Sequence, residues 1–270
     1  MFTREKFMTK ISVIMAEYNT TPQYLRESIE SILSQTFRDF DFIIIDDCGT
    51  NNLAKIVESY ADPRIKIVRN KQNSGLVASL NTAIEKADGE YLVRMDTDDI
   101  AMPNRIETLY KAVLANPEYA VIGSRAVEFS DRGEKGILSS KGEKAGRNIM
   151  RGDVPVHPSV IMKKEVIKKV GGYPSFNRAE DLALWCELVL AGQKIYVLDD
   201  VLLRYRVNDD DYTKRKLRNR KGEIKVRMYY YPKLGAGPVE YFRVVKSIIA
   251  GVLPAQLVNA IRRKYILKGD

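Results

Sequence analysis

Residues 91–100, YLVRMDTDDI, decide the fold assignment, because an apolar segment here runs directly into three carboxylates. The bulky and β-branched residues that open it are typical of a strand, and Pro103 follows closely, so Asp96, Asp98 and Asp99 lie where a strand ends and a loop begins. Carboxylates this close repel one another by about 1 kcal/mol or more per pair at an intermediate dielectric. Either water screens this acidic turn or a cation binds there.

The first half of the chain alternates strand-like and helix-like segments. Strands are predicted at 10–16, 40–47, 64–70 and 91–96, and helices at 24–37, 53–61 and 76–87. This alternation predicts an α/β fold with a doubly wound, mainly parallel sheet and helices on both faces. Further on, helices are expected at 105–116, at 165–172 and, opened by Asp181, at 182–192, and strands at 120–129, 194–200 and 202–207, whereas residues 130–153 read as a mobile or irregular loop.

The net charge of +9 is concentrated at the C-terminal end. Residues 212–270 contain 15 Lys and Arg against 3 Asp and Glu, a net charge of +12, whereas residues 1–211 carry a net charge of −3. We therefore predict a catalytic domain over 1–211 and a basic, amphipathic helical tail over 212–270. Two distant cysteines and one histidine argue against a disulfide framework and against a zinc site, and the N-terminus has no signal-peptide pattern.

A second acidic strand end supports the cation hypothesis. Asp46 and Asp47 close the segment 40–47, and ligands of such sheets bind at the carboxyl ends of the strands. Residues two apart on an extended chain share a face, so Asp96 and Asp98 can point together. Mg²⁺ and Mn²⁺ are hard ions that suit one or two carboxylates together with water and substrate phosphates. The alternative is a solvated turn that caps the next helix.

Six ordered segments, ISVIMAEYN, ILSQTF, FIIIDDCGTNN, NSGLVASLNTAI, GEYLVRMDTDDIAMPNRI and AEDLALW, resemble the landmarks of family 2 glycosyltransferases over residues 10–205. The resemblance implies a GT-A fold and an inverting enzyme that moves a sugar from a nucleoside diphosphate to a hydroxyl, using Mn²⁺ or Mg²⁺. The sequence has no QxxRW-type motif near residue 205, which favours a single transfer over processive synthesis.

The same resemblance implies roles for individual residues. The nucleotide sugar is expected to contact residues of four loops, with Tyr18 against the base and Asp47 accepting from the base imide: Ala16, Glu17, Tyr18, Asn19, Asp47, Asn73, Gly75, Asp96 and Asp98. Asp98 and Asp99 are expected to ligate the metal. Two positions depart from the commoner pattern, since Ala16 replaces a proline or threonine and Cys48 begins a run that is usually Gly-Ser-Thr.

Asp181 matches the catalytic base of the family, and the neighbouring Glu180 is a candidate second acid. A base is required because an acceptor hydroxyl is a poor nucleophile until its proton is removed. The alternative role for Asp181 is an N-terminal helix cap. His157, between two prolines, is a candidate contact to the diphosphate or the metal, with a structural or exposed histidine as the alternative.

The tail has three interpretations. No nucleic-acid-binding motif accompanies its basic segment, so we expect no nucleic-acid partner. Apolar residues recur at helical spacing before Pro254, namely Val244, Val245, Ile248, Ile249 and Val252. Such a stripe beside basic residues is typical of a helix in an anionic membrane interface, and it can equally pack on the domain or on a second copy of the chain.

The resemblance implies a glycosyltransferase of cell-surface polysaccharide assembly, with a UDP-sugar as the first choice of donor and a glycan or lipid-linked acceptor. We expect it in the cytoplasm, peripheral at the inner face of the membrane. A nucleotidyltransferase would instead carry a glycine-rich, basic phosphate loop after the first strand, where this chain has AEYNTTPQ. A non-catalytic nucleotide-sugar or membrane-binding module would have no need of Asp181.

Overall fold

A large central sheet organises the protein, for which the computed structural model describes residues 10–176, 178–207 and 217–252. In this part of the chain the strand order is β3-β2-β1-β4-β9-β6-β10-β5, with β7 paired to β6 and β8 to β10. The strands are β1 (Ile11–Glu17), β2 (Phe40–Asp46), β3 (Ile65–Arg69), β4 (Tyr91–Arg94), β5 (Ile100–Ala101), β6 (Tyr119–Ser130), β7 (Gly133–Leu138), β8 (Gly142–Glu143), β9 (Val160–Lys163) and β10 (Lys194–Arg206).

Helices enclose this sheet. They are α1 (Pro22–Leu33), α2 (Leu53–Glu58), α3 (Leu76–Lys86), α4 (Arg105–Ala115), α5 (Gly146–Met150), α6 (Lys164–Lys169), α7 (Glu180–Leu190), α8 (Leu217–Tyr230) and α9 (Pro238–Val252), with a 3-10 turn, η1 (His157–Ser159), before β9.

Most of the paired residues lie in parallel ladders, as predicted, although β5, β7, β8 and β9 pair in antiparallel fashion. β1 pairs in parallel with β2 and β4, β2 with β3, and β6 with β10. In the middle, β9 interrupts this arrangement, since it is antiparallel to both β4 and β6, which therefore run in the same direction. The carboxyl ends of β1, β2 and β4 consequently lie along one edge.

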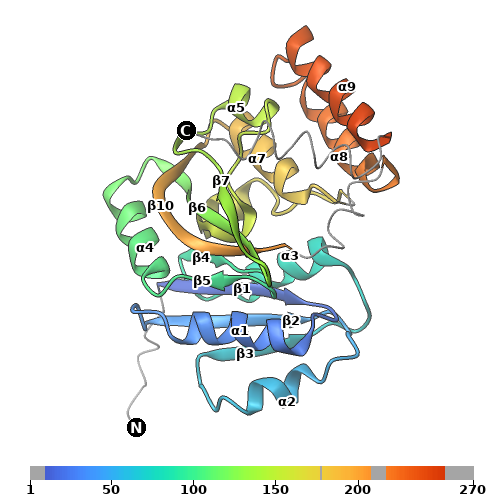
Figure 1. Cartoon of the computed structure of the whole chain (residues 1–270). Helices are drawn as coiled ribbons and strands as arrows, with labels where there is room; N and C mark the ends of the chain where they lie inside the picture. The colour runs from blue at the N-terminus through green and yellow to red at the C-terminus, as the bar shows by residue number, and fades with distance from the viewer. Residues whose placement is uncertain (1–9, 177, 208–216, 253–270) are drawn as a thin grey trace.

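Both faces of the sheet are covered by helices (Figure 1). Alternate residues of β1 enter different cores: Val13 packs with side chains of α1, α2 and α4, whereas Ile14 packs with those of α3 and α7. Because successive strand residues point to opposite faces, nearly continuous apolar strands such as FIIID are what a sheet covered on both sides requires. The prediction of a doubly wound α/β fold is confirmed.

The prediction of an irregular loop over 130–153 is wrong. β6 continues through a tight turn into β7, and these strands form an antiparallel hairpin from Ala126–Leu138 to Ser130–Gly133. The segment then adds β8 and α5. These elements are short and interrupted by glycines, so they lack the periodicity on which the prediction depended. Likewise the two strands expected at 194–200 and 202–207 are one strand, β10, whose register shifts between Val197 and Val201.

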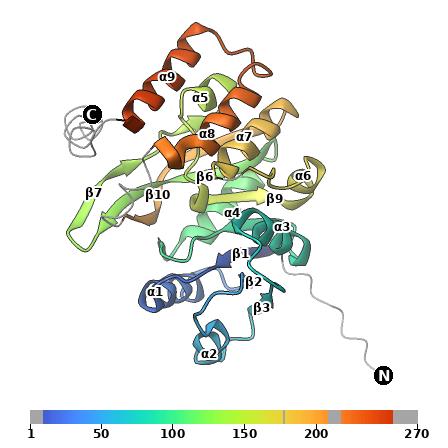
Figure 2. The ribbon, with the colours of Figure 1, turned by 90° about the vertical axis from the view of Figure 1, so that its right-hand side faces the viewer.

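The described part of the C-terminal tail packs on the domain. Val226, Tyr230 and Tyr231 of this region are buried, and the Tyr230 hydroxyl donates to Glu187 Oε1 of α7 at 2.7 Å. Of the predicted apolar stripe, Val244 is buried and Ile248 packs in the same cluster, so this part packs on the domain, whereas Val245 is exposed. Figures 1 and 2 show α8 and α9 side by side at the end of the molecule that also carries α5 and α7. Residues 208–216 and 253–270, with the predicted boundary at 211 and Pro254, lie outside the described residues. No helix within the described ranges is long and apolar enough to cross a bilayer.

Candidate active site

Acidic loops from different strands meet at one sheet edge. Glu17, the last residue of β1, is in register with Asp46 of β2, and Ile14 of β1 is in register with Arg94 of β4. The loop that begins at Met95 continues along β1, because the Met95 amide donates to the Ile14 carbonyl at 3.0 Å. The two acidic strand ends therefore lie on one edge of the sheet, and their convergence on one cleft stays a prediction.

A buried arginine neutralises the first acid of the loop. Arg94 is 1% exposed, and its Nη1 lies 2.5 Å from Asp96 Oδ1. Although burial alone disfavours the cation, the charge of Asp96 keeps the pKa of Arg94 raised overall. The pair fixes the orientation of Asp96 at the mouth of the loop.

Asp99 is buried at the other end of the loop. Its Oδ1 accepts the Arg206 amide at 2.8 Å, and its Oδ2 is buried without a hydrogen-bond partner. Burial, followed by the charges of Asp96 and Asp98, raises the pKa of Asp99 well above its ordinary value. Asp99 is therefore a desolvated acid placed beside two other acids.

The acid loop, residues 95–99 between β4 and β5, fits a hard divalent cation. Within the described ranges no group of three or more histidine, cysteine or acidic side chains forms a complete metal site. Mg²⁺ and Mn²⁺ need only one or two carboxylates when water and phosphate oxygens supply the other ligands. The orphaned Oδ2 of Asp99 and the mutual repulsion of the acids are the features that a cation would relieve.

A second buried arginine holds the end of β4 in place. Arg105, at the start of α4, is fully buried and donates through Nη2 to the carbonyls of Arg94, at 2.6 Å, and Pro158, at 2.5 Å. Burial lowers the pKa of Arg105 to about 9. The residue connects the end of β4 to η1 and so holds two walls of the site together.

The loop after β1 is held by Glu17, whose Oε1 accepts the Thr20 amide at 2.9 Å and Asn51 Nδ2 at 3.0 Å. Its Oε2 is buried and has no partner. Asn19 has a left-handed backbone, with φ of 57°, and its Oδ1 accepts from the Thr50 amide. Tyr18 is 54% exposed, so its ring is accessible to a ligand. Ala16 is half-buried.

Asp47 organises the loop before α3. Its Oδ1 accepts from Asn70 Nδ2 at 2.6 Å and from the Ser74 amide at 2.8 Å, and its Oδ2 accepts from the Gly75 amide at 2.8 Å. Gly75 has φ of 82°, a conformation that favours glycine. Asp47 is only 3% exposed, so its primary contact here is with its own loop, and pairing with a base imide stays a prediction. Asn73 is exposed nearby.

Helix α7 presents the predicted base. The N-cap position is occupied by Ala179, in a left-handed conformation with φ of 58°, so Glu180 and Asp181 are the first two residues of the helix. The alternative in which Asp181 is the helix cap is therefore wrong. Burial raises the pKa of Asp181, and burial followed by the charge of Asp181 raises the pKa of Glu180.

One cavity brings together the acids of α7, Asp96 and Arg94, whereas Asp98, Asp99 and Asp47 are not among its lining residues. It has a volume of about 410 Å³ and contains the predicted base, the first acid of the loop and the buried arginine on a partly apolar wall. Its lining residues are Leu76, Arg94, Asp96, Leu138, Val154, Pro155, Val156, His157, Pro158, Glu180, Asp181 and Tyr205. A larger cavity of about 900 Å³ also contains Leu76 and Glu180 and extends between α3 and the residues before α7.

His157 lies in the cavity wall, 9% exposed. Its Nε2 is 2.7 Å from the Tyr173 hydroxyl, and its ring packs edge-on against Trp185. Burial, and to a smaller extent the charge of Arg94, lowers the pKa of His157 well below its ordinary value, so the ring is neutral. These contacts agree with the structural alternative, and a role toward the diphosphate or metal stays a prediction.

Comparison with known proteins identifies the family. The family model described as Glycosyl transferase family 2 matches residues 12–171. The chain belongs to glycosyltransferase family 2. EpsE of Bacillus subtilis, a glycosyltransferase by name, is 31% identical over 267 residues, which cover 96% of this chain and 95% of that protein. The UDP-Gal:alpha-D-GlcNAc-diphosphoundecaprenol beta-1,3-galactosyltransferase of Escherichia coli is 29% identical over 271 residues, covering 95% of this chain and 96% of its own.

Solved structures agree with the GT-A fold. A fragment of S. aureus TarS in complex with UDP-GlcNAc superimposes with a TM-score of 0.61 at 26% identity, covering 74% of this chain and 59% of that one. A Pyrobaculum calidifontis mannosyltransferase in complex with GDP-Man and Mn²⁺ gives a TM-score of 0.65 at 20% identity and covers 97% of this family 2 chain and 81% of its own. The protein is therefore a nucleotide-sugar-dependent glycosyltransferase.

Sequence reasoning missed three arginines of the site, Arg94, Arg105 and Arg206. Arg94 had a usable signal, since a cation within an otherwise apolar buried strand requires a partner. Arg105 and Arg206 had none, because their partners lie on elements that become neighbours only in the folded chain.

Proposed function

We propose that this family 2 enzyme is an inverting, metal-dependent glycosyltransferase that moves a sugar from UDP to a hydroxyl of a glycan or lipid-linked acceptor in cell-surface polysaccharide assembly. The observation that carries the proposal is the single cavity that contains Asp181 beside Asp96 and Arg94. A proton acceptor and the first acid of the loop thus line the same cavity, as attack on a sugar bound through its diphosphate requires.

In this mechanism the acceptor hydroxyl loses its proton to Asp181 as its oxygen attacks the anomeric carbon. The bond from that carbon to the diphosphate oxygen breaks on the opposite face, so the configuration inverts. Because burial raises the pKa of Asp181, its carboxylate is a stronger base than an exposed aspartate. Glu180, the candidate second acid, lines the same cavity and is available to hold the acceptor through a hydrogen bond.

The metal would be held by Asp98 and Asp99, with Asp96 as the neighbouring acid of the loop. When bound, Mn²⁺ or Mg²⁺ would stabilise the negative charge that develops on the departing diphosphate. Arg94 fixes Asp96 through its ion pair and so keeps the loop in one conformation.

Two observations favour a UDP-sugar donor. The TarS fragment of similar fold is in complex with UDP-GlcNAc, and the E. coli relative is named for UDP-Gal. We assign Ala16, Glu17, Tyr18, Asn19, Asp47, Asn73 and Gly75 to the uridine and ribose side of the donor, with the base against Tyr18. The exposed ring of Tyr18 supports this assignment, because stacking requires an accessible face.

The proposal includes a lipid-linked acceptor and a position of the enzyme at the membrane. The name of the E. coli relative specifies a diphosphoundecaprenol-linked sugar. Helix α9 exposes Val239, Phe242 and Val245 at three-residue spacing, by 59%, 68% and 49%, on a tail of net charge +12. An apolar helix face beside basic residues favours a peripheral position on an anionic membrane, at its cytoplasmic face.

Calorimetry and a donor panel test the proposal. UDP should bind more tightly with Mn²⁺ than with EDTA, and Asp98→Ala should remove that difference. A panel of nucleotide sugars should then identify the donor by hydrolysis in the presence of Mn²⁺. UDP binding that is equally strong with and without metal, or unchanged in Asp98→Ala, would contradict the assignment of the acid loop.

A further inference from the structure

The last residue of β10 is placed against the acid loop although it is far from it in sequence. Arg206 is 6% exposed, and its guanidinium carbon lies over two aromatic rings, 4.0 Å from the centroid of Tyr24 in α1 and 4.5 Å from that of Phe129 in β6. Contact with both rings restricts the orientation of the planar group. Its N–H groups therefore point in fixed directions around the rim of that plane.

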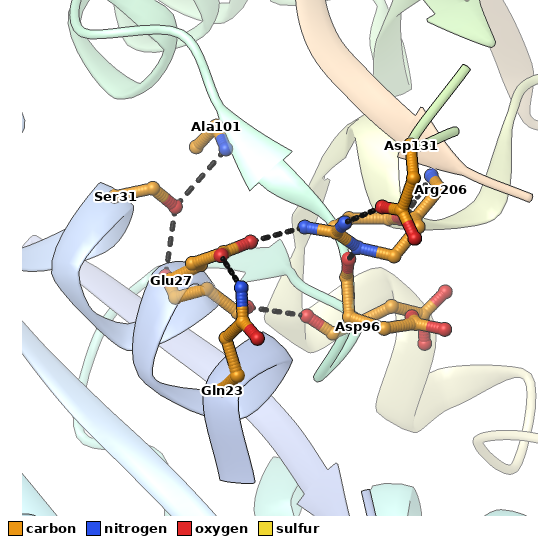
Figure 3. Close-up of polar contacts among 10 residues, drawn as sticks. Gln23, Glu27, Ser31, Asp96, Ala101, Asp131 and Arg206 are labelled. Carbon is orange, nitrogen blue, oxygen red and sulfur yellow. Dashed lines mark hydrogen bonds and ion pairs between the residues drawn. The ribbon is translucent and has the colours of Figure 1, made fainter. Parts of the chain in front are cut away.

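The N–H groups of Arg206 point toward the acid loop, toward α1 and toward the β6–β7 turn (Figure 3). The guanidinium Nε donates to the Asp98 carbonyl at 2.7 Å, and the backbone amide of Arg206 donates to Asp99 Oδ1 at 2.8 Å. On the other side, Nη2 pairs with Glu27 of α1, and Nη1 lies 4.0 Å from Asp131 at the β6–β7 turn. One residue thus joins the loop to a helix and to a hairpin.

Helix α1 completes this support. Ser28 Oγ donates to the Asp96 carbonyl at 2.7 Å, and Gln23 Nε2 donates to the other oxygen of Glu27, Oε1, at 2.9 Å. The loop has little regular structure of its own, since β4 ends at Arg94 and β5 begins at Ile100. The backbone of an acidic loop that lies outside a strand ladder must be held by side chains, because its own charges repel.

We infer that Arg206 is a positioning residue for the metal- and diphosphate-binding loop. Its guanidinium fixes the backbone of Asp98, beside the Asp99 carboxylate that its backbone amide holds, and Arg206→Gln removes the guanidinium contact while it keeps the amide. The inference rests on the proposed function. Arg206 acts through these two residues and is buried beneath them, so it needs no contact with substrate. Groups that orient metal ligands typically contribute about 10- to 100-fold to metal affinity or activity.

Arg206→Gln tests this role, with Arg204→Gln as the matched control. Arg204 lies on the same strand and stacks on the same Phe129 ring at 4.3 Å, but it pairs with Glu134 of β7. We expect Arg206→Gln to weaken UDP binding in Mn²⁺ by about tenfold or more while binding in EDTA stays within about twofold. Arg204→Gln should match the wild type in both conditions. Calorimetry with UDP over a series of Mn²⁺ concentrations, alongside a thermal melt, provides these readouts.

A second variant covers the case in which Arg206→Gln does not fold. Glu27→Gln removes the charge that pairs with Nη2 on the side away from the loop, at a carboxylate whose side chain is 34% exposed. A weaker loss in the same Mn²⁺-dependent part of binding is expected. If Arg206→Gln or Glu27→Gln folds and its UDP binding depends on Mn²⁺ as in the wild type, the inference is overturned and the proposed function is not. A wild-type protein that binds no UDP in Mn²⁺ overturns the proposed function, and the inference with it.

Discussion

The guanidinium of Arg94 lies 2.5 Å from the carboxylate of Asp96, and Arg94 is almost completely buried while Asp96 faces the cavity. The ion pair therefore joins the core of the sheet to the site. His157, Tyr173 and the two acids of α7 lie close enough for the charge of Arg94 to affect their pKa values or its own. Arg94 is the central cation of this cavity.

Replacing Arg94 by methionine should be costly. Asp96 would lose its partner beside Glu180 and Asp181, and breaking a buried ion pair typically costs about 3–5 kcal/mol. Because the Asp96 side chain is one third exposed, we expect a loss of about 2–4 kcal/mol in the free energy of unfolding. Arg125→Met, which breaks the more exposed Arg125–Asp199 pair, should cost about 1 kcal/mol or less. Urea unfolding of both variants checks the difference.

The pH dependence of transfer should report the base. Burial raises the pKa of Asp181, and a base acts only when deprotonated, so activity should be full at high pH and should fall as pH decreases through this raised value. The midpoint of kcat/KM should lie above about 3.9, the ordinary pKa of aspartate. UDP binding measured over the same pH range distinguishes protonation of Asp181 from protonation of the acid loop. A midpoint at or below the ordinary value would contradict the assignment.

Helix α8 should contribute to the stability of the whole domain. Tyr231 follows α8 directly, is fully buried and donates its hydroxyl to the Met150 carbonyl at 2.7 Å, so Tyr231→Ala should lower the free energy of unfolding by about 3–5 kcal/mol. Tyr229, two residues away, is 51% exposed, and Tyr229→Ala should cost about 1 kcal/mol or less. Equal costs in denaturant unfolding would mean that α8 does not pack as described.

Binding to anionic vesicles should depend on the apolar face of α9. Phe242→Glu replaces the most exposed apolar side chain of that face by a charged one. We expect about tenfold weaker association with the vesicles, since burial of an aromatic side chain contributes about 1.5–3 kcal/mol. Leu114→Glu, at a 54% exposed position on α4, is the control and should bind normally. Association with neutral vesicles as strong as with anionic ones would remove the electrostatic part of the proposal.

The fold was predictable where the sequence signal is local. The strands that lead to Asp46 and Asp96 are apolar segments with acids at their ends, and parallel pairing brings such ends to one edge whatever the details of packing. The β6–β7 hairpin escaped prediction because its second strand, GEKGIL, is exposed and contains two glycines, so it has no apolar alternation.

The partners of the site were not predictable, because they are set by tertiary contacts. Arg206 and Asp99 are 107 residues apart, and only the return of β10 beside β5 and β6 makes them neighbours. Asp47 was expected to face a nucleobase, yet its described partners are the side chain of Asn70 and two amides of the loop before α3. Residue type and position at a strand end identify a candidate, whereas its hydrogen-bond partners require the assembled chain.

Asp181→Asn distinguishes a transferase from a binding module. The substitution keeps the shape of the side chain, and the amide oxygen of an asparagine here can still accept the Leu182 amide that Asp181 Oδ1 accepts at 2.7 Å. Folding and UDP affinity in Mn²⁺ should therefore be preserved, while transfer should fall by at least about 10²-fold, the usual contribution of a general base. Glu180→Gln is the matched control, because it neutralises the adjacent acid of the same cavity and should reduce transfer less. Near-normal transfer by a folded Asp181→Asn enzyme would falsify Asp181 as the base.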